Sequence, residues 1–167
     1  MKIYTVLFLI ILSTVYSQKQ VAITIDDLVN TRLYEELDYN APLLDKINEL
    51  QIPVAIFINP VNIYYRESVV KNVELFDRWV SNDLVSLGNH TYDHPRYSEV
   101  GFPDFVLNIE KAEHIIEPHA NRYNKELKYF RFPYNDLGAD TASNKMIKAY
   151  LESKDYVLTA HTVESSD

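Results

Sequence analysis

The sequence contains no cysteine among its 167 residues, so the chain can form no disulfide. A domain without disulfides depends on its hydrophobic core, and on a bound metal where one is present. The hydrophobic content of 47% and the aromatic content of 13% are sufficient for one sizeable core. The length leaves no room for two ordinary domains, and we expect a single one.

Basic residues are scarce relative to acidic ones. The chain carries 16 Lys and Arg against 24 Asp and Glu, which gives a net charge of -8. Binding of nucleic acid or of an anionic membrane surface requires clustered Lys and Arg. The balance therefore argues against a nucleic-acid partner and favours a neutral or cationic substrate. Composition leaves the oligomeric state open.

The sequence also lacks a hydrophobic run long enough to span a bilayer. Its N-terminal apolar run covers residues 3–12, whereas a transmembrane helix needs about 20 such residues. The run follows Met1 and Lys2, and small residues precede the polar residues 18–20. This pattern predicts a signal peptide over residues 1–17 and an exported, periplasmic or extracellular domain over residues 18–167, with no membrane span after cleavage.

Short apolar segments alternate with helical patterns along the rest of the chain. We expect strands over residues 21–25, 53–58, 84–87, 129–132 and 156–163, and helices over residues 42–50, 68–81, 105–117 and 143–154. The last turn of the helix over 105–117 is expected to stop at Pro118. Such alternation is typical of an α/β fold built around parallel strands.

Polar residues follow three of the expected strands at the point where each ends. Asp26 and Asp27 follow the first strand, His90 and His94 follow the third, and Arg131 lies at the end of the fourth. The carboxyl ends of parallel strands carry the chemistry in folds of this class. Asp and His ligands suit a borderline cation such as zinc, with a further position left for water. This arrangement predicts a metal-dependent hydrolase.

Simpler explanations exist for each pair of residues. Two adjacent aspartates after a strand often form only a turn or a helix cap. His90 and His94 can be a hydrogen-bonded pair within a loop, and Asp93 competes with them as a ligand. The joint occurrence of both pairs with the segment over residues 131–134 favours a functional site.

Three segments resemble the motifs of a known family. Residues 24–27 (TIDD), 90–94 (HTYDH) and 131–134 (RFPY) are similar, in order and spacing, to the first three motifs of the polysaccharide deacetylases. This family is carbohydrate esterase family 4, which carries the NodB-like homology domain. The resemblance covers nearly all of the chain after residue 17. It implies a distorted, incomplete (β/α) barrel that removes acetyl groups from a polysaccharide or amino sugar by N- or O-deacetylation.

The resemblance also assigns roles to individual residues. It implies that Asp26 is the general base and that Arg131 pairs with it and orients it. Pro133 and Tyr134 would wall the substrate groove, and a backbone N–H of Tyr134 would help to hold the oxyanion. These roles agree with general acid–base and electrostatic catalysis of acyl transfer.

The metal ligands implied by the family pattern are Asp27, His90 and His94. The ion is usually zinc, with Co²⁺, Ni²⁺ or Mn²⁺ as alternatives. Thr91 would brace the loop between the two histidines. A metal in such a site acidifies a bound water and polarises the acetyl carbonyl.

Two departures from the family pattern affect these expectations. Leu28 stands where the first motif usually has glycine, which puts the shape of the substrate site in question. Residues 163–167 look like the start of the fourth motif, and the fifth motif, with the histidine that protonates the leaving group, is absent. His161 has the wrong surroundings to replace that histidine. We therefore expect little deacetylase activity from these 167 residues, and a general acid beyond residue 167.

Two alternative functions remain. The same site could hydrolyse a C–N bond in a non-carbohydrate amide, or the chain could be a non-catalytic glycan-binding relative. Asp26 argues against the second alternative, because binding alone needs no general base. Peptidoglycan, chitin-like oligomers and acetylated xylan all remain candidate substrates.

Overall fold

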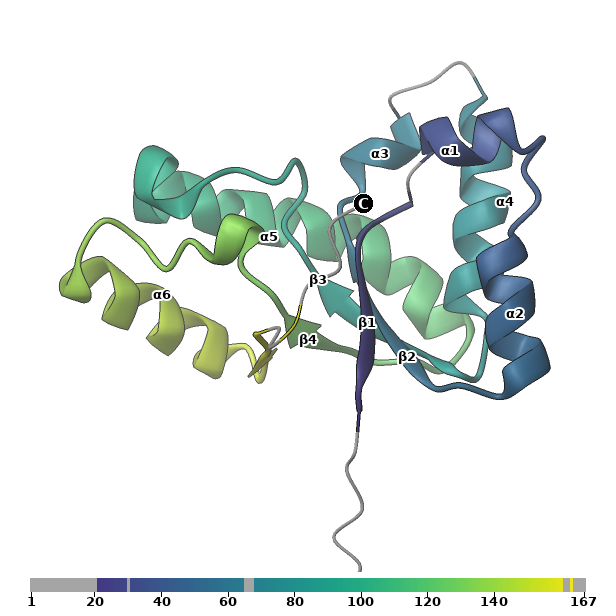
Figure 1. Ribbon diagram of the computed structural model, residues 1–167. Coiled ribbons are helices and arrows are strands. Elements are labelled where there is room, and N and C mark those ends of the chain that lie inside the picture. The colour runs from purple at the N-terminus through teal and green to yellow at the C-terminus, as the bar shows by residue number, and fades with distance from the viewer. Residues whose placement is uncertain (1–20, 30, 65–67, 161–162, 164–167) are drawn as a thin grey trace, which may run out of the picture.

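A computed structural model describes residues 21–29, 31–64, 68–160 and 163. Five parallel strands form one sheet in the order β1-β2-β3-β4-β5 (Figure 1). The strands are β1 (Ile23–Leu28), β2 (Val54–Ile58), β3 (Val85–Asn89), β4 (Leu127–Phe130) and β5 (Val157–Leu158). The expected signal peptide, His161 and residues 164–167 lie outside the described residues.

The strands are connected mainly by helices. These are α1 (Thr31–Glu36), α2 (Pro42–Leu50), α3 (Val61–Tyr64), α4 (Val69–Val80), α5 (Tyr97–Arg122) and α6 (Thr141–Ser153), with a 3₁₀ turn η1 (Pro133–Asn135). The short elements α1, α3 and η1 are too brief to leave a periodic signal in the sequence. Among the described helices, none combines the length and apolar character that crossing a bilayer requires.

The strand order explains how the sheet is wound. Every strand pairs with its neighbour along the chain, and every pairing is parallel. Crossovers between parallel strands are right-handed, so a sheet without a reversal of strand order keeps its connecting helices on one face. This is the winding of a (β/α) barrel, whereas a doubly wound sheet reverses its order. The α/β prediction is confirmed, and the described strands form an open part of such a barrel.

Several predicted strand boundaries were wrong; β4, for example, covers Leu127–Phe130 rather than residues 129–132. Strand β1 begins at Ile23 and continues through the two aspartates to Leu28. Strand β5 covers only two residues, Val157–Leu158, rather than residues 156–163. Its pairing with β4 is prolonged by one further contact, in which the Thr159 N–H donates to the Phe130 carbonyl at 2.9 Å.

Helix α5 does not stop at Pro118. It begins at Tyr97, kinks at Gly101 (φ 77°) and continues to Arg122. Proline removes one helical hydrogen bond, yet Ile116 and Ala120 on either side of Pro118 are completely buried. Tertiary packing on both sides therefore outweighs the local cost of the proline.

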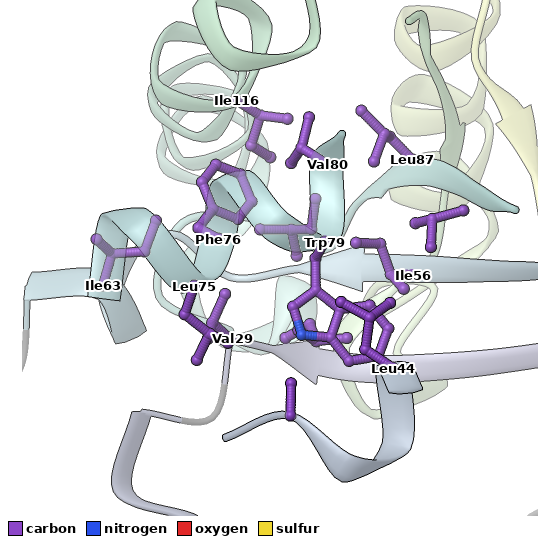
Figure 2. Packing of buried hydrophobic residues seen from close by; sticks show 14 of the residues in the cluster. Val29, Leu44, Ile56, Ile63, Leu75, Phe76, Trp79, Val80, Leu87 and Ile116 are labelled. Carbon is purple, nitrogen blue, oxygen red and sulfur yellow. The ribbon is translucent and has the colours of Figure 1, made fainter. Parts of the chain in front are cut away.

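Helix α4 contributes the centre of the larger hydrophobic core (Figure 2). The Phe76 side chain is completely buried there, and its ring meets the His119 ring edge-on at 5.0 Å. Truncating a buried phenylalanine removes apolar burial and leaves a cavity. We expect Phe76→Ala to lower the free energy of unfolding by about 3–5 kcal/mol in urea denaturation.

The matched control for this prediction is Val70→Ala on the same helix. Val70 is 72% exposed, and surface substitutions of this kind change stability by about 0.5 kcal/mol or less. Equal effects of the two substitutions would contradict the assignment of Phe76 to the core.

Candidate metal centre

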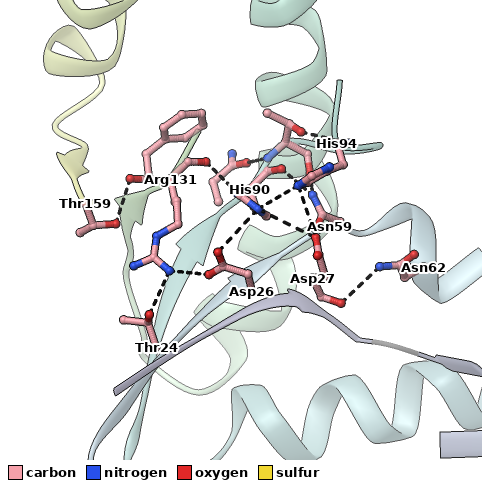
Figure 3. Close-up of polar contacts among 12 residues, drawn as sticks. Thr24, Asp26, Asp27, Asn59, Asn62, His90, His94, Arg131 and Thr159 are labelled. Carbon is pink, nitrogen blue, oxygen red and sulfur yellow. Dashed lines mark hydrogen bonds and ion pairs between the residues drawn. The ribbon is translucent and has the colours of Figure 1, made fainter. Parts of the chain in front are cut away.

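A bulge in β1 places two adjacent carboxylates in the same site. Ile25 pairs with Ile56, but Leu28 pairs with Ile58, so β1 holds one more residue than β2 over this interval. Neighbouring side chains of a regular strand point to opposite faces. Here Asp27 adopts φ 58°, and the bulge redirects its side chain. Both carboxylates lie close to the His90 Nε2 atom, that of Asp26 at 4.0 Å and that of Asp27 at 3.9 Å (Figure 3).

The loop after β3 supplies both histidines and is held by several hydrogen bonds. The Thr91 N–H donates to the Asn89 side-chain oxygen at 2.8 Å, and the His94 N–H donates to the Thr91 hydroxyl at 3.2 Å. Asn59, which directly follows β2, donates through its side-chain amide to the carbonyls of His90 and Thr91. Thr91 thus lies between the two histidines and connects the backbone of His94 to the side chain of Asn89.

The tautomer of His90 is fixed by one backbone contact. Its Nδ1 atom lies 2.8 Å from the Arg131 carbonyl oxygen, which can only accept, so Nδ1 carries the proton. The Nε2 lone pair therefore faces the carboxylates. Burial lowers the pKa of His90 below its ordinary value, opposed by the Arg131 carbonyl and the neighbouring aspartates. A neutral imidazole with a free Nε2 is the form that binds a metal.

The spacing of the three candidate ligands fits a small divalent cation. Ligand atoms of Asp27, His90 and His94 all lie within 4.8 Å of one another. The two Nε2 atoms are 3.2 Å apart, and the Asp27 Oδ1 atom lies 3.6 Å from that of His94 and 3.9 Å from that of His90. Ligands of tetrahedral zinc at about 2.0–2.1 Å from the ion are about 3.3 Å apart. The donor set and its spacing therefore suit zinc or a similar ion.

Asp26 is engaged by an arginine. The Arg131 guanidinium donates to the Asp26 Oδ1 atom at 2.6 Å and to the Thr24 hydroxyl at 2.9 Å. Arg131 is almost completely buried, and its guanidinium lies over the Phe57 ring at 4.1 Å from the ring centre. One Asp26 oxygen is thus committed to Arg131, and the other faces the histidines. Asp26 and Asp27 have different environments although they are neighbours in sequence.

Gly88 leaves space for the Phe57 ring, over which the Arg131 guanidinium lies. A Cβ atom at this position would lie 2.5 Å from the Phe57 ring. Real Cβ atoms do not approach another atom so closely, and any larger residue would displace Phe57. The glycine in β3 therefore helps to position the arginine that holds Asp26.

A cavity of about 420 Å³ opens over these groups. Its lining residues are Asp26, Asp27, His90, His94, Arg96, Arg131, Phe132, Tyr134 and Asn135. Tyr134 is largely exposed, with its ring 4.4 Å from that of His94 and 3.9 Å from the Arg96 guanidinium. Pro133 is buried and does not line the cavity. Phe132, the preceding residue, lines the cavity, and contact of Pro133 with a substrate stays a prediction.

Several site residues adopt the left-handed backbone region that is uncommon for residues other than glycine. Besides Asp27, these are Thr91 (φ 67°), His94 (φ 61°), Tyr134 (φ 57°) and Asn135 (φ 52°). Each such residue costs about 1–3 kcal/mol and persists only where the surroundings impose it. Such conformations gather at functional sites, which agrees with the position of these residues around the cavity.

Sequence reasoning missed three groups that contribute to this site. Arg96 and Asn135 line the cavity, and Asn59 holds the histidine loop from the neighbouring strand. Arg96 lies two residues after the segment 90–94, and Asn135 directly follows the segment 131–134. This closeness to the motifs was the signal in the sequence that could have identified them. Asp93, the competing ligand, instead accepts a hydrogen bond from the Asn108 amide at 2.6 Å.

Comparison with known proteins gives concordant matches. A family model described as polysaccharide deacetylase matches residues 14–156. A peptidoglycan-N-acetylglucosamine deacetylase from Bacillus cereus is 26% identical over 122 residues, which cover 73% of this chain and 38% of the relative. The chain therefore spans less than half the length of this curated relative.

Solved structures with a similar fold include a protein described as an esterase and one described as a pseudoenzyme. A family 4 carbohydrate esterase from Bacillus anthracis is 20% identical, with a TM-score of 0.58 over 83% of this chain and 57% of that chain. A protein described as a CE4 family pseudoenzyme from Bacillus anthracis is 16% identical, with a TM-score of 0.58 over 85% of this chain and 43% of that chain. At these identities the likeness establishes the fold alone.

Proposed function

The chain belongs to the polysaccharide deacetylase family, and from this premise we propose that it is a metal-dependent hydrolase that removes acetyl groups from an acetylated glycan. One observation carries the proposal. A candidate metal triad, Asp27, His90 and His94, lies in the same cavity as the ion pair between Asp26 and Arg131. A ligand set alone would support only metal binding, whereas the adjacent oriented carboxylate supplies a base.

The proposed mechanism assigns a separate task to each aspartate. Asp27, together with His90 and His94, would hold the ion, which would be zinc or a first-row neighbour. A divalent ion bound there would acidify a water molecule and polarise the acetyl carbonyl. Asp26 accepts the proton of the attacking water with the oxygen that Arg131 leaves open. Arg131 holds that carboxylate in place through the 2.6 Å contact.

The opposite wall of the cavity has a different role. Tyr134 lies in the turn η1 beside the histidines, and we assign its backbone N–H to the developing oxyanion. Its exposed ring, backed by His94 and Arg96, offers an aromatic face to a sugar ring. Phe132 also lines this cavity.

The wider biological assignment follows from the family and the N-terminal pattern. Residues 1–17 are proposed as a signal peptide and residues 18–167 as the catalytic domain of an exported protein. The Bacillus cereus relative is described as a peptidoglycan-N-acetylglucosamine deacetylase. This description supports peptidoglycan, a glycan of the cell wall, as the acetylated substrate. N-deacetylation is therefore favoured over O-deacetylation.

A non-catalytic role is the second candidate, because a protein of similar fold is described as a pseudoenzyme. The geometry distinguishes the two on one point. The Asp26 carboxylate is paired with a buried arginine and directed at the candidate ligands, an arrangement that glycan binding does not require.

The proposed function is tested with the zinc-loaded chain and two kinds of acetylated substrate. An aryl acetate such as 4-nitrophenyl acetate needs no proton on its leaving group, and so its hydrolysis reports only on the metal, the base and the oxyanion donors. We expect stoichiometric zinc, aryl acetate hydrolysis that a chelator abolishes, and slower acetate release from chitin oligosaccharides. A folded chain that binds zinc yet hydrolyses neither substrate would favour the non-catalytic role.

A further inference from the structure

A line of hydrogen bonds connects the histidine loop to a buried carboxylate on helix α5. The Thr91 N–H donates to the Asn89 side-chain oxygen at 2.8 Å, and the Asn89 amide donates to the Tyr156 hydroxyl at 3.0 Å. The Tyr156 hydroxyl lies 3.1 Å from the Glu113 carboxylate, which also receives the Lys154 ammonium at 2.9 Å. The line joins β3, the residue before β5, and α5, which are distant in sequence.

All donors along this line point in the same direction. The Thr91 N–H donates to the Asn89 side chain, the Asn89 amide donates to the Tyr156 hydroxyl, and the Tyr156 hydroxyl donates to Glu113. The His94 N–H donates to the Thr91 hydroxyl, which is a separate group of the same residue. Hydrogen bonds arranged in series polarise one another and gain strength together. A carboxylate at the accepting end strengthens the last bond further. Glu113 therefore strengthens the hydrogen bonds that hold the loop between the two histidines.

The environment of Tyr156 keeps it in the form that this line requires. The side chain is 8% exposed, and burial raises its pKa well above the ordinary value, with Glu113 acting in the same direction against the Asn89 contact. The phenol therefore stays protonated and continues to donate to Glu113. Asn89 is completely buried, and its side-chain amide also donates to the Ile109 carbonyl at 3.2 Å.

We propose that Tyr156 is a positioning residue for the metal site. Its hydroxyl, fixed by Glu113 and Lys154, orients the Asn89 side chain, and Asn89 in turn fixes the loop that carries His90 and His94. The inference rests on the proposed function, because it assigns a role in organising the proposed ligands. Ligands whose supporting hydrogen bonds are removed bind metal less tightly, since their geometry is no longer preset.

A role in core packing alone is the alternative explanation of Tyr156. Its ring packs against Phe130 at 5.7 Å between ring centres, within the smaller hydrophobic cluster. Tyr156→Phe retains the ring and removes only the hydroxyl. Tyr97→Phe is the matched control, because Tyr97 is buried in the same cluster and donates to the Ser143 carbonyl at 2.9 Å, outside the line.

The test compares Co²⁺ affinity and the visible spectrum of bound Co²⁺ in the unsubstituted protein and both variants. We expect Tyr156→Phe to weaken Co²⁺ binding about tenfold and to change the spectrum, because partners of metal ligands contribute about 10–100-fold and this hydroxyl is remote from the ion. Tyr97→Phe should leave both unchanged. Equal Co²⁺ affinity and identical spectra in Tyr156→Phe and the unsubstituted protein would overturn the inference.

A second measurement needs no metal and separates this inference from the proposed function. In the metal-free protein, hydrogen exchange at the Thr91 and His94 amides should accelerate in Tyr156→Phe and stay unchanged in Tyr97→Phe. Glu113→Gln, which keeps the side-chain shape, should accelerate the same amides. Failure of the unsubstituted protein to bind any metal would remove the proposed function, whereas unaltered exchange in both variants would remove the role of Tyr156.

Discussion

Replacing His94 with alanine is expected to abolish stoichiometric zinc binding while the chain remains folded. The substitution removes one of three candidate ligands and leaves Asp27 and His90, which cannot hold zinc tightly as a pair. Loss of a supporting hydrogen bond weakens metal binding about 10–100-fold, and loss of a ligand should exceed that range. Zinc content after dialysis and competition with a chromophoric chelator measure the effect.

Circular dichroism and a distant histidine provide the controls for this experiment. His94 is only partly buried and lies in a loop, so its truncation leaves no large core cavity. His114 is exposed on α5 and is not part of the candidate cluster, and His114→Ala should retain full zinc binding. Retention of tight stoichiometric zinc in His94→Ala would show that the ion is held elsewhere.

Asp26→Asn is expected to reduce aryl acetate hydrolysis by about 10²–10⁴-fold while zinc stays bound. Asparagine has nearly the same shape as aspartate, but its amide cannot accept the proton of the attacking water. The Asp26 carboxylate is paired with Arg131 and is not one of the three candidate ligands, which is why we propose that its charge serves the reaction rather than the ion. Initial rates at saturating zinc are the measurement.

Asp27→Asn is the contrasting variant, since the two aspartates are neighbours of identical chemistry. We expect zinc affinity to fall in Asp27→Asn and to persist in Asp26→Asn, because the candidate cluster includes only Asp27. Arg131 is almost completely buried and loses the charge of its partner in Asp26→Asn. Thermal unfolding of both variants checks that the protein remains folded. The reverse pattern of zinc loss would exchange the two assigned roles.

The candidate site was predictable to the extent that it depends on strand ends. Asp26, His90 and Arg131 occur at or next to the carboxyl ends of β1, β3 and β4, and apolar runs in the sequence locate those strands within a few residues. Parallel pairing then brings the ends to one edge of the sheet. Secondary-structure pattern and residue type were therefore enough to group them.

The groups that support the site had no such signal. Asn59, Asn89 and Tyr156 act through single hydrogen bonds between segments that are far apart along the chain. Asparagine and tyrosine occur throughout ordinary sheets and loops, and neither type by itself indicates a contact. The continuation of α5 past Pro118 was missed for a related reason, because packing of the flanking residues decided it.

The sequence by itself determined the α/β class, the order of the main helices and strands, and the identity of the residues gathered at the edge of the sheet, because hydrophobic periodicity and the ends of apolar runs are local properties. Tertiary structure alone decided the different environments of Asp26 and Asp27. Those environments depend on the extra residue in β1, the left-handed conformation of Asp27 and the contact of Asp26 with Arg131. Each of these results from packing between distant segments, which adjacent identical residues cannot encode by themselves.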